Sequence, residues 1–177
     1  MKLDPERAVL VVIDVQEAFR KALPSFDRVA ASSATLVQGA AAIGLPVVVT
    51  EQYPSGLGAT VAEVAEHLPE GTATLAKVRF SAAEAEGFEL GERDQALVCG
   101  IEAHVCVNQT VLDLIDEDVE VHVAADAVGS RTEANRELGL AKMERAGAVL
   151  TSVEMALFEL LGGSDAKAFK QVQALVK

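Results

Sequence analysis

Two cysteines, Cys99 and Cys106, lie on one strand-turn-helix segment, and Cys106 has the setting of a reactive thiol. Residues 96–110 read as a short apolar strand, a turn at Gly100 and the start of a helix whose first turn holds Cys106. Unpaired N–H groups at a helix N-terminus carry partial positive charge and stabilise a thiolate. Cys106 is therefore a candidate nucleophile, although most free cysteines are buried and inert. Cys99 lies inside the strand, and we expect it to be a core residue.

An acid and a lysine end two other apolar runs. Asp14 directly follows residues 8–13, and Lys77 ends the short run 74–77. A carboxylate after a buried strand is costly to desolvate without partners, so Asp14 indicates either a cap on the next segment or a functional site. Taken by itself, Lys77 is typical of a solvated surface residue.

Strand-like and helical segments alternate along the whole chain and must position these side chains. Apolar runs typical of buried parallel strands occupy residues 8–13, 45–50, 74–77, 95–99, 120–124 and 147–151. Helical spacing occupies residues 29–44, 60–68, 104–116, 132–146, 153–161 and 165–176. We therefore predict one α/β domain over residues 1–177, with a parallel sheet and helices on both faces.

This architecture predicts where the three side chains meet. In open α/β sheets, ligands bind beyond the carboxyl ends of the strands, at the point where the strand order reverses. Asp14, Lys77 and Cys106 each follow or end a predicted strand. We therefore expect them at the same edge of the sheet.

The composition narrows the classes of partner. The chain has 177 residues and a net charge of −12, which argues against nucleic acids and anionic membranes as partners. No apolar run approaches the roughly 20 residues that span a bilayer, and no signal-peptide pattern opens the sequence. We expect a cytoplasmic protein with reduced thiols and a small-molecule substrate.

Three segments together resemble the cysteine hydrolases of the isochorismatase-like superfamily: the Ile-Asp14-Val-Gln16 motif, the Lys77 segment and residues 100–110. The resemblance covers essentially the whole chain, and residues 50–58 are most similar to the isochorismatase domain-containing subgroup. It implies a three-layer Rossmann-like fold, in which a six-stranded parallel sheet is flanked by helices, and a homo-oligomer.

The resemblance also implies roles for the three side chains. Cys106 would attack a carbonyl carbon to form a thioester-type intermediate. Asp14 would take the thiol proton and pass it to the leaving amine. Lys77 would offset the charge of Asp14. A carboxylate raises the pKa of a neighbouring thiol, whereas a lysine and a helix N-terminus lower it, and we expect their sum to give a thiolate near neutral pH.

The superfamily pattern further implies an oxyanion hole formed by the backbone amides of Glu102 and Cys106. A cis peptide often precedes the first of these donors in the superfamily, which predicts a cis Ile101–Glu102 bond. Neither residue is proline, so the site itself would have to hold the cis form.

Other residues are weaker candidates for substrate binding. Gln16, Phe19, Gln52 and Tyr53 would rim the pocket if the loops fold back as in relatives. Helix packing is an equally good interpretation of Phe19. Arg79 has the chemistry to bind a substrate carboxylate, but we favour a surface or subunit contact for it.

The sequence departs from the metal-binding members of the superfamily. Its three histidines, His67, His104 and His122, are widely spaced and make no ligand cluster, so we expect no metal and no cofactor. Nicotinamide is then a poor guess for the substrate. Isochorismate is not expected either, because isochorismatases proper usually lack the cysteine.

The sequence thus predicts a metal-independent cysteine hydrolase that cleaves a small amide or related C–N carbonyl compound. The alternative is a catalytically weak or inactive oligomeric module that binds small ligands on the same fold. A dinucleotide-binding protein is disfavoured, because no G-x-G-x-x-G motif follows the first strand.

Overall fold

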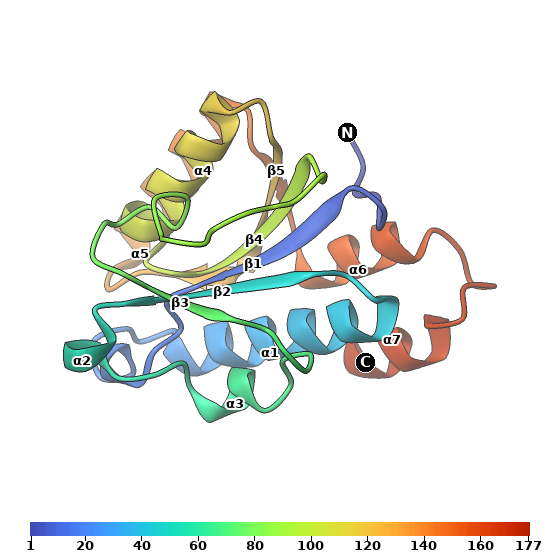
Figure 1. The fold of residues 1–177 in the computed structure, drawn as a ribbon, viewed down its shortest axis with the longest axis horizontal. Helices are drawn as coiled ribbons and strands as arrows, with labels where there is room; N and C mark the ends of the chain where they lie inside the picture. Colours follow the sequence, from blue (N-terminus) through green and yellow to red (C-terminus); the bar gives the residue numbers. More distant parts are fainter.

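The computed structural model describes residues 1–177 and contains one six-stranded parallel sheet. The strand order is β3-β2-β1-β4-β5-β6, with helices on both faces of the sheet (Figure 1). The strands are β1 (Ala8–Ile13), β2 (Val47–Gln52), β3 (Thr74–Lys77), β4 (Gln95–Ile101), β5 (Glu120–Gly129) and β6 (Val149–Thr151). The predicted three-layer Rossmann-like architecture is confirmed.

The helices connect the strands and cover the sheet. They are α1 (Phe26–Ile43), α2 (Pro54–Leu57), α3 (Ala62–Ala65), α4 (Asn108–Asp116), α5 (Glu133–Ala146), α6 (Val153–Leu161) and α7 (Phe169–Leu175). A 3-10 turn, η1 (Glu17–Phe19), follows β1, and a π-helical turn, η2 (Ala103–Val107), precedes α4. None of these helices combines the length and the apolar composition that a membrane-spanning segment needs.

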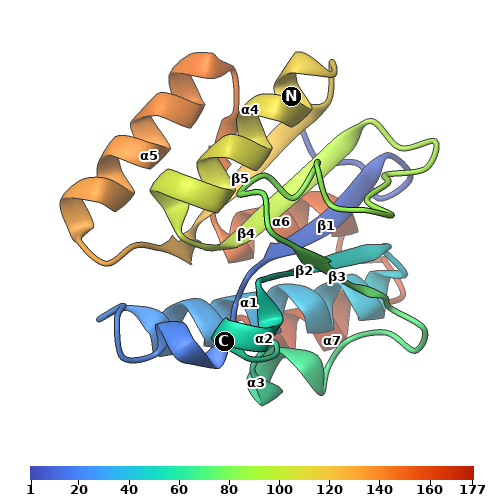
Figure 2. The same ribbon diagram turned by 60° about the vertical axis from the view of Figure 1, so that its left-hand side comes forward.

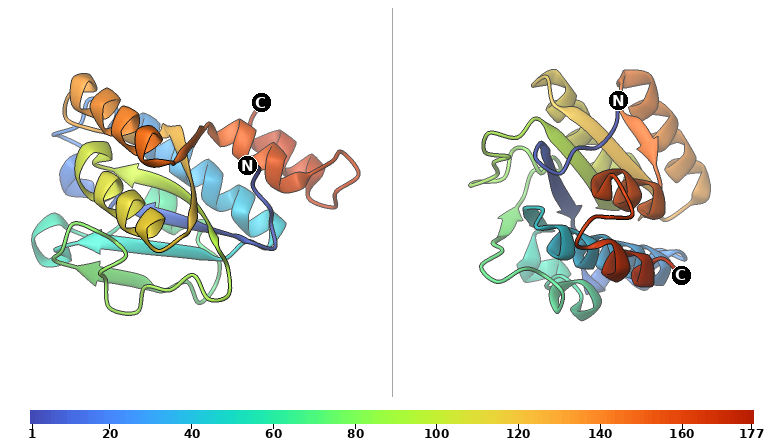
Figure 3. Two further views of the ribbon diagram at one scale, coloured as in Figure 1. Left: turned by 90° about the horizontal axis from the view of Figure 1, so that it is seen from above. Right: turned by 90° about the vertical axis from the view of Figure 1, so that its right-hand side faces the viewer.

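Side chains of β1 alternate between two cores, because successive residues of a strand point to opposite faces of the sheet. Leu10 and Val12 belong to a core built with α1, α6 and α7, which pack together in Figure 3. Val11 and Ile13 belong to a second core built with α4 and α5, which lie side by side in Figure 2. Every residue of β1 is buried, as expected for a central parallel strand.

The strand order reverses between β1 and β4. The chain leaves β1 toward α1 on one face and leaves β4 toward α4 on the other, so the segments after these two neighbouring strands diverge (Figure 2). Such a divergence leaves a crevice outside the carboxyl ends of the strands. Asp14 follows β1 and Cys106 lies just after β4, so both residues are at this point.

Gly100 lets β4 approach β1 closely at the same point. It has φ +122° and pairs in register with Ile13, and a Cβ at this position would collide with the Ile13 carbonyl oxygen. Only glycine fits both requirements. The residue immediately before Asp14 is therefore packed directly against the strand that leads to the cysteine.

Several predicted elements have different limits in the structure, and contacts explain two of these differences. The helix expected over residues 60–68 is shorter in the structure and is limited to α3. It starts later because Thr60 N and Oγ1 both donate to Glu51 Oε1, at 2.5 and 2.8 Å, and hold the chain before α3 extended. The strand expected to end at residue 124 continues to Gly129, which pairs with Ile101 of β4. Both changes come from contacts with other segments of the chain.

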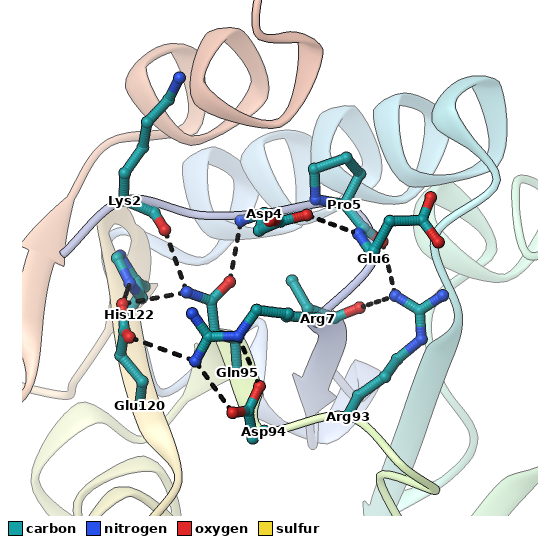
Figure 4. Close-up of polar contacts among 11 residues, drawn as sticks. Lys2, Asp4, Pro5, Glu6, Arg7, Arg93, Asp94, Gln95, Glu120 and His122 are labelled. Carbon is teal, nitrogen blue, oxygen red and sulfur yellow. Dashed lines mark hydrogen bonds and ion pairs between the residues drawn. The ribbon is translucent and has the colours of Figure 1, made fainter.

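A polar network ties the N-terminal segment to the amino ends of β4 and β5 (Figure 4). Gln95 accepts from Asp4 N at 2.8 Å and donates to Lys2 O and Glu120 Oε1, both at 3.0 Å. His122 Nε2 lies 2.9 Å from the same Glu120 oxygen. His122 therefore has a structural place in its strand, at the end of the sheet opposite to the cysteine.

This network predicts a pH dependence of stability. Burial acts to raise the pKa of Glu120, but hydrogen bonds from His122 and Gln95 and the charge of Arg7 hold that pKa below its usual value. A lowered folded-state pKa stabilises the fold above the unfolded-state pKa of about 4.3, and this stabilisation is lost as pH falls through the folded-state value. In urea unfolding at pH 7 and pH 3.5, Glu120→Gln should lose stability mainly at pH 7. Glu137→Gln, an exposed control, should follow the wild type, and an equal loss at both pH values in Glu120→Gln would contradict the prediction.

Candidate active site

Asp14 and Lys77 form a buried ion pair at the carboxyl edge of the sheet. Asp14 Oδ2 lies 2.7 Å from Lys77 Nζ, and the two side chains are 0% and 1% exposed. Asp14 Oδ1 accepts a hydrogen bond of 2.8 Å from Thr50 Oγ1. Both carboxylate oxygens therefore have a partner, which a buried charge requires.

The backbone of Asp14 has φ +53°, in the left-handed region that residues with side chains adopt rarely. Such strain persists only where the surrounding structure imposes it, and it is concentrated at functional sites. The turn directs the chain from β1 into η1, while the Asp14 amide donates to the Thr50 carbonyl at 3.1 Å.

Lys77 is held by more acceptors than its ammonium group has protons. Besides Asp14, Nζ contacts Gln52 Oε1 at 2.7 Å, Phe80 O at 2.9 Å and Arg79 O at 3.3 Å. An ammonium group has three protons to donate, so its position is fully determined. The surface interpretation of Lys77, which its local sequence favours, is therefore wrong.

Gln16 supports this arrangement through a buried side chain. Its side chain is fully buried, donates to Gln52 O at 3.0 Å and to Gly58 O at 2.6 Å, and accepts from Gln52 N at 2.8 Å. Gln52 in turn donates to Val78 O at 3.0 Å. Gln16 thus positions Gln52, and Gln52 positions Lys77.

A cavity of about 290 Å³ lies beside β3, and of the predicted rim residues only Tyr53 lines it. Phe19 packs against the core, which is the alternative interpretation of this residue. Arg79 lines the cavity, but its side chain is 74% exposed and 3.6 Å from Glu84, as expected for a surface residue. The full lining is Tyr53, Pro54, Ala76, Lys77, Val78, Arg79, Glu84, Ala85 and Glu86. Neither Asp14 nor Cys106 contributes to this cavity.

Cys106 lies in the π-helical turn η2, where a regular α-helical turn was expected. The Val107 N–H reaches five residues back, to the Glu102 carbonyl at 3.2 Å, which widens the turn. Such turns are frequent at functional sites. The cysteine is only 6% exposed and packs in the same core as Ile13.

Two threonines that the sequence did not single out hold the site together. Thr110 Oγ1 donates to Cys106 O at 2.7 Å and accepts from Ala82 N at 2.8 Å, which joins the cysteine turn to the segment that surrounds Lys77. Thr50 holds Asp14. The only sequence signal for Thr50 is its position at the end of the second apolar run, because Thr110 and Thr50 otherwise look like ordinary helix and strand residues.

Burial, and to a smaller extent the charge of Asp14, raise the pKa of the Cys106 thiol to about 12, although Lys77 acts to lower it. The prediction of a thiolate near neutral pH is therefore wrong, because the effect of desolvation on the pKa outweighs that of Lys77. Complete burial also raises the pKa of Cys99 to about 12, consistent with a core residue. In the resting protein Cys106 is a neutral thiol that needs a base.

The peptide bond between Ile101 and Glu102 is cis, as predicted. The Glu102 N–H donates to no acceptor within the protein. No group of three or more histidine, cysteine, aspartate or glutamate residues lies close enough together to hold a metal ion.

The buried pair predicts a large effect of removing one partner. Lys77→Met leaves the Asp14 carboxylate buried without a counter-charge, so the free energy of unfolding should fall by roughly 3–5 kcal/mol. The double variant Asp14→Asn/Lys77→Met should recover much of this loss, because no uncompensated charge remains. Urea unfolding at pH 7 measures both, with the exposed Lys142→Met as control. A single variant as stable as the wild type would contradict the burial argument.

The opposing charges predict a shift in thiol reactivity. Asp14→Asn removes a charge that raises the pKa of Cys106 and leaves Lys77, so alkylation should begin at lower pH than in the wild type. Iodoacetamide labelling between pH 6 and 11, read for each cysteine by mass spectrometry, measures this shift. Cys99 serves as the buried reference within the same chain. An unchanged Cys106 profile would show that the charge of Asp14 does not act on the thiol.

Comparison with known proteins identifies the fold family. The isochorismatase domain family matches residues 8–155. Isochorismatase domain-containing protein 2 from Homo sapiens is 40% identical over 176 residues, which are 98% of this chain and 84% of the relative. The secreted isochorismatase effector Isc1 from Phytophthora sojae (strain P6497) is 40% identical over 183 residues, 99% of this chain and 87% of the relative.

A solved structure agrees with these sequences. The structure of the MAR1 ribonuclease from Caenorhabditis elegans superposes with a TM-score of 0.94 and 39% identity, covering 99% of this chain and 92% of that one. The resemblance drawn from the sequence, including the domain-containing subgroup, is confirmed. With a match over most of its length and relatives at 39–40% identity, this chain belongs to the isochorismatase family and has the hydrolase fold of that family.

Proposed function

We propose that the protein is a metal-independent cysteine hydrolase that cleaves a small amide or a related C–N carbonyl compound. The observation that carries the proposal is the buried Asp14–Lys77 ion pair, whose two charges both act on the thiol of Cys106. A base, a counter-charge and a nucleophile are the groups that acyl transfer through a covalent intermediate requires.

The first half of the proposed reaction forms a thioester. Cys106 Sγ attacks the carbonyl carbon while its proton passes to Asp14, so that the thiol need not ionise in advance. The carbonyl oxygen becomes an oxyanion, for which the amides of Glu102 and Cys106 are the proposed donors. When the intermediate collapses, the C–N bond breaks, and Asp14 returns the proton to the leaving nitrogen.

The second half releases the acid. Water attacks the thioester carbon and gives a proton to Asp14, and as the C–S bond breaks Asp14 returns this proton to the sulfur, which restores the thiol and the carboxylate. One amide and one water thus yield one carboxylic acid and one amine. Lys77 compensates the charge of the Asp14 carboxylate at Oδ2, and Thr50 donates to Oδ1 of the same carboxylate. These two contacts orient Asp14 throughout the proposed cycle.

The closed surroundings of Cys106 favour a small substrate. The cysteine is only 6% exposed, so a bulky acyl group has no room to approach the sulfur. Tyr53, Val78 and Phe80 are exposed apolar side chains on the segments that follow β2 and β3. We therefore also propose a homo-oligomer, in which a second copy covers these side chains. The cytoplasmic location stays a prediction, because the Phytophthora relative is named as secreted.

RNA is the specific rival substrate, since the Caenorhabditis relative is named as a ribonuclease. The net charge of −12 opposes binding of a polyanion, because nucleic-acid affinity comes mainly from basic residues that neutralise phosphates. The second rival, a binding module without turnover, would keep the fold and lose the chemistry.

A substrate panel tests the proposal. Short primary amides and ureido compounds are offered at pH 7.5, and released ammonia is measured, with a single-stranded RNA oligonucleotide alongside. Cys106→Ala and Asp14→Asn should each lower kcat/KM by roughly 10³-fold or more, as loss of a triad member does elsewhere. Cys99→Ala is the matched control and should keep activity.

Three outcomes would contradict the proposal. Amide turnover that survives Cys106→Ala would exclude the cysteine as nucleophile. RNA cleavage that depends on Cys106, without amide turnover, would favour the ribonuclease. Binding of amides by a well-folded protein without any turnover would favour the binding module.

A further inference from the structure

An ion pair between Glu102 and Arg131 holds the turn that follows β4. Glu102 Oε2 accepts hydrogen bonds from Arg131 N at 3.0 Å and from Arg131 Nε at 3.1 Å, and Glu102 Oε1 lies 3.1 Å from Arg131 Nη2. The Glu102 side chain is 6% exposed, whereas that of Arg131 is 61% exposed. This two-pronged geometry fixes the orientation of both planar groups.

Two further contacts join the same segments. His104 Nδ1 lies 3.0 Å from Ser130 Oγ, one residue before Arg131. Gly139 of α5 packs so closely on the turn that a Cβ there would lie 2.9 Å from Ala103 O. The turn between β4 and Cys106 therefore contacts both the loop before α5 and α5 itself. These contacts come from the β5 side of β4, whereas Lys77 belongs to β3 on the other side.

The backbone N–H of Glu102 is the one polar group of this residue without a partner in the protein. Its carboxylate is bound by Arg131, and its carbonyl accepts from Val105 N at 3.0 Å and Val107 N at 3.2 Å. Its backbone N–H donates to nothing in the protein, although the residue is only 5% exposed. Buried amides are nearly always hydrogen-bonded, so an unpaired N–H on a residue that is fixed by other contacts points to a ligand oxygen as its acceptor.

We propose that Arg131 is a positioning residue: its ion pair with Glu102 holds the Glu102 amide as a donor to the oxyanion of the reaction. The inference rests on the proposed hydrolase function and adds a residue from β5–α5, outside the proposed catalytic set. A displacement of the amide by even about 1 Å would weaken a hydrogen bond that must form only in the transition state.

Two reactions of the same thiol separate this role from a general structural one. Acylation of Cys106 by p-nitrophenyl acetate develops negative charge on a carbonyl oxygen and therefore uses the oxyanion hole. Alkylation by iodoacetamide displaces iodide from a saturated carbon and develops no such charge. The ratio of the two rates reports the oxyanion donors, independently of the reactivity and accessibility of Cys106.

The experiment compares Arg131→Gln, Arg131→Lys and Glu102→Gln with the wild type. Arg145→Gln is the matched control, because Arg145 is an exposed arginine of α5 without an ion pair. Mass spectrometry identifies acetylated and alkylated Cys106, and p-nitrophenolate release gives the acylation rate. We expect Arg131→Gln to acylate about 10-fold or more slowly while alkylation changes by less than about 2-fold. Arg131→Lys should be intermediate, since lysine keeps the charge but not the planar fork.

Stability is separated from positioning by the double variant Glu102→Gln/Arg131→Gln, which leaves no buried charge unpaired. Slow acylation in a double variant that unfolds like the wild type supports positioning. Equal slowing of acylation and alkylation, or wild-type acylation in Arg131→Gln, would overturn it. If the wild type is alkylated at Cys106 but never acylated there, the proposed hydrolase function fails, and this inference fails with it.

Discussion

The cost of burying two charges organises this protein. Asp14 and Lys77 are both buried at the carboxyl edge of the sheet. Burying an unpaired carboxylate or ammonium there would cost roughly several kcal/mol of desolvation free energy. Each charge therefore has a complete set of partners, and those partners come from the ends of β1, β2 and β3 and from the segment after β3. The ion pair thus connects the loops at this edge through their backbone carbonyls and side chains.

The sheet brings these partners together because its strands are parallel and the order reverses beside β1. Residues that follow β1 and β4 emerge at the same edge and then separate toward opposite faces. Gly100 makes the approach of the two strands closer than any other residue would allow. The cysteine turn then begins one strand away from the carboxylate, and Thr110 connects it to the segment that holds Lys77.

Burial also decides the state of the nucleophile. Desolvation is the largest influence on Cys106 and raises its pKa, so the nearby lysine does not produce a free thiolate at rest. A thiol of this kind is protected from oxidation and unspecific alkylation, since both need the thiolate. Proton transfer to the neighbouring carboxylate becomes part of the proposed reaction, and the position of Asp14 matters more than the intrinsic acidity of the thiol.

Local patterns in the sequence determined the elements, and tertiary contacts decided what the polar residues do. The runs 8–13 and 74–77 coincide with β1 and β3, because a continuous apolar run is a local property of a doubly buried strand. The sequence motifs around Asp14, Lys77 and Cys106, in this order along the chain, were sufficient to recognise the family. Lys77 by itself reads as a surface residue, and Gln16 reads as a pocket residue. Their actual places depend on segments tens of residues away, as do the pairing of Glu102 with Arg131 and the pKa of Cys106. Such distances are set by the packing of the whole sheet, and no local pattern encodes them.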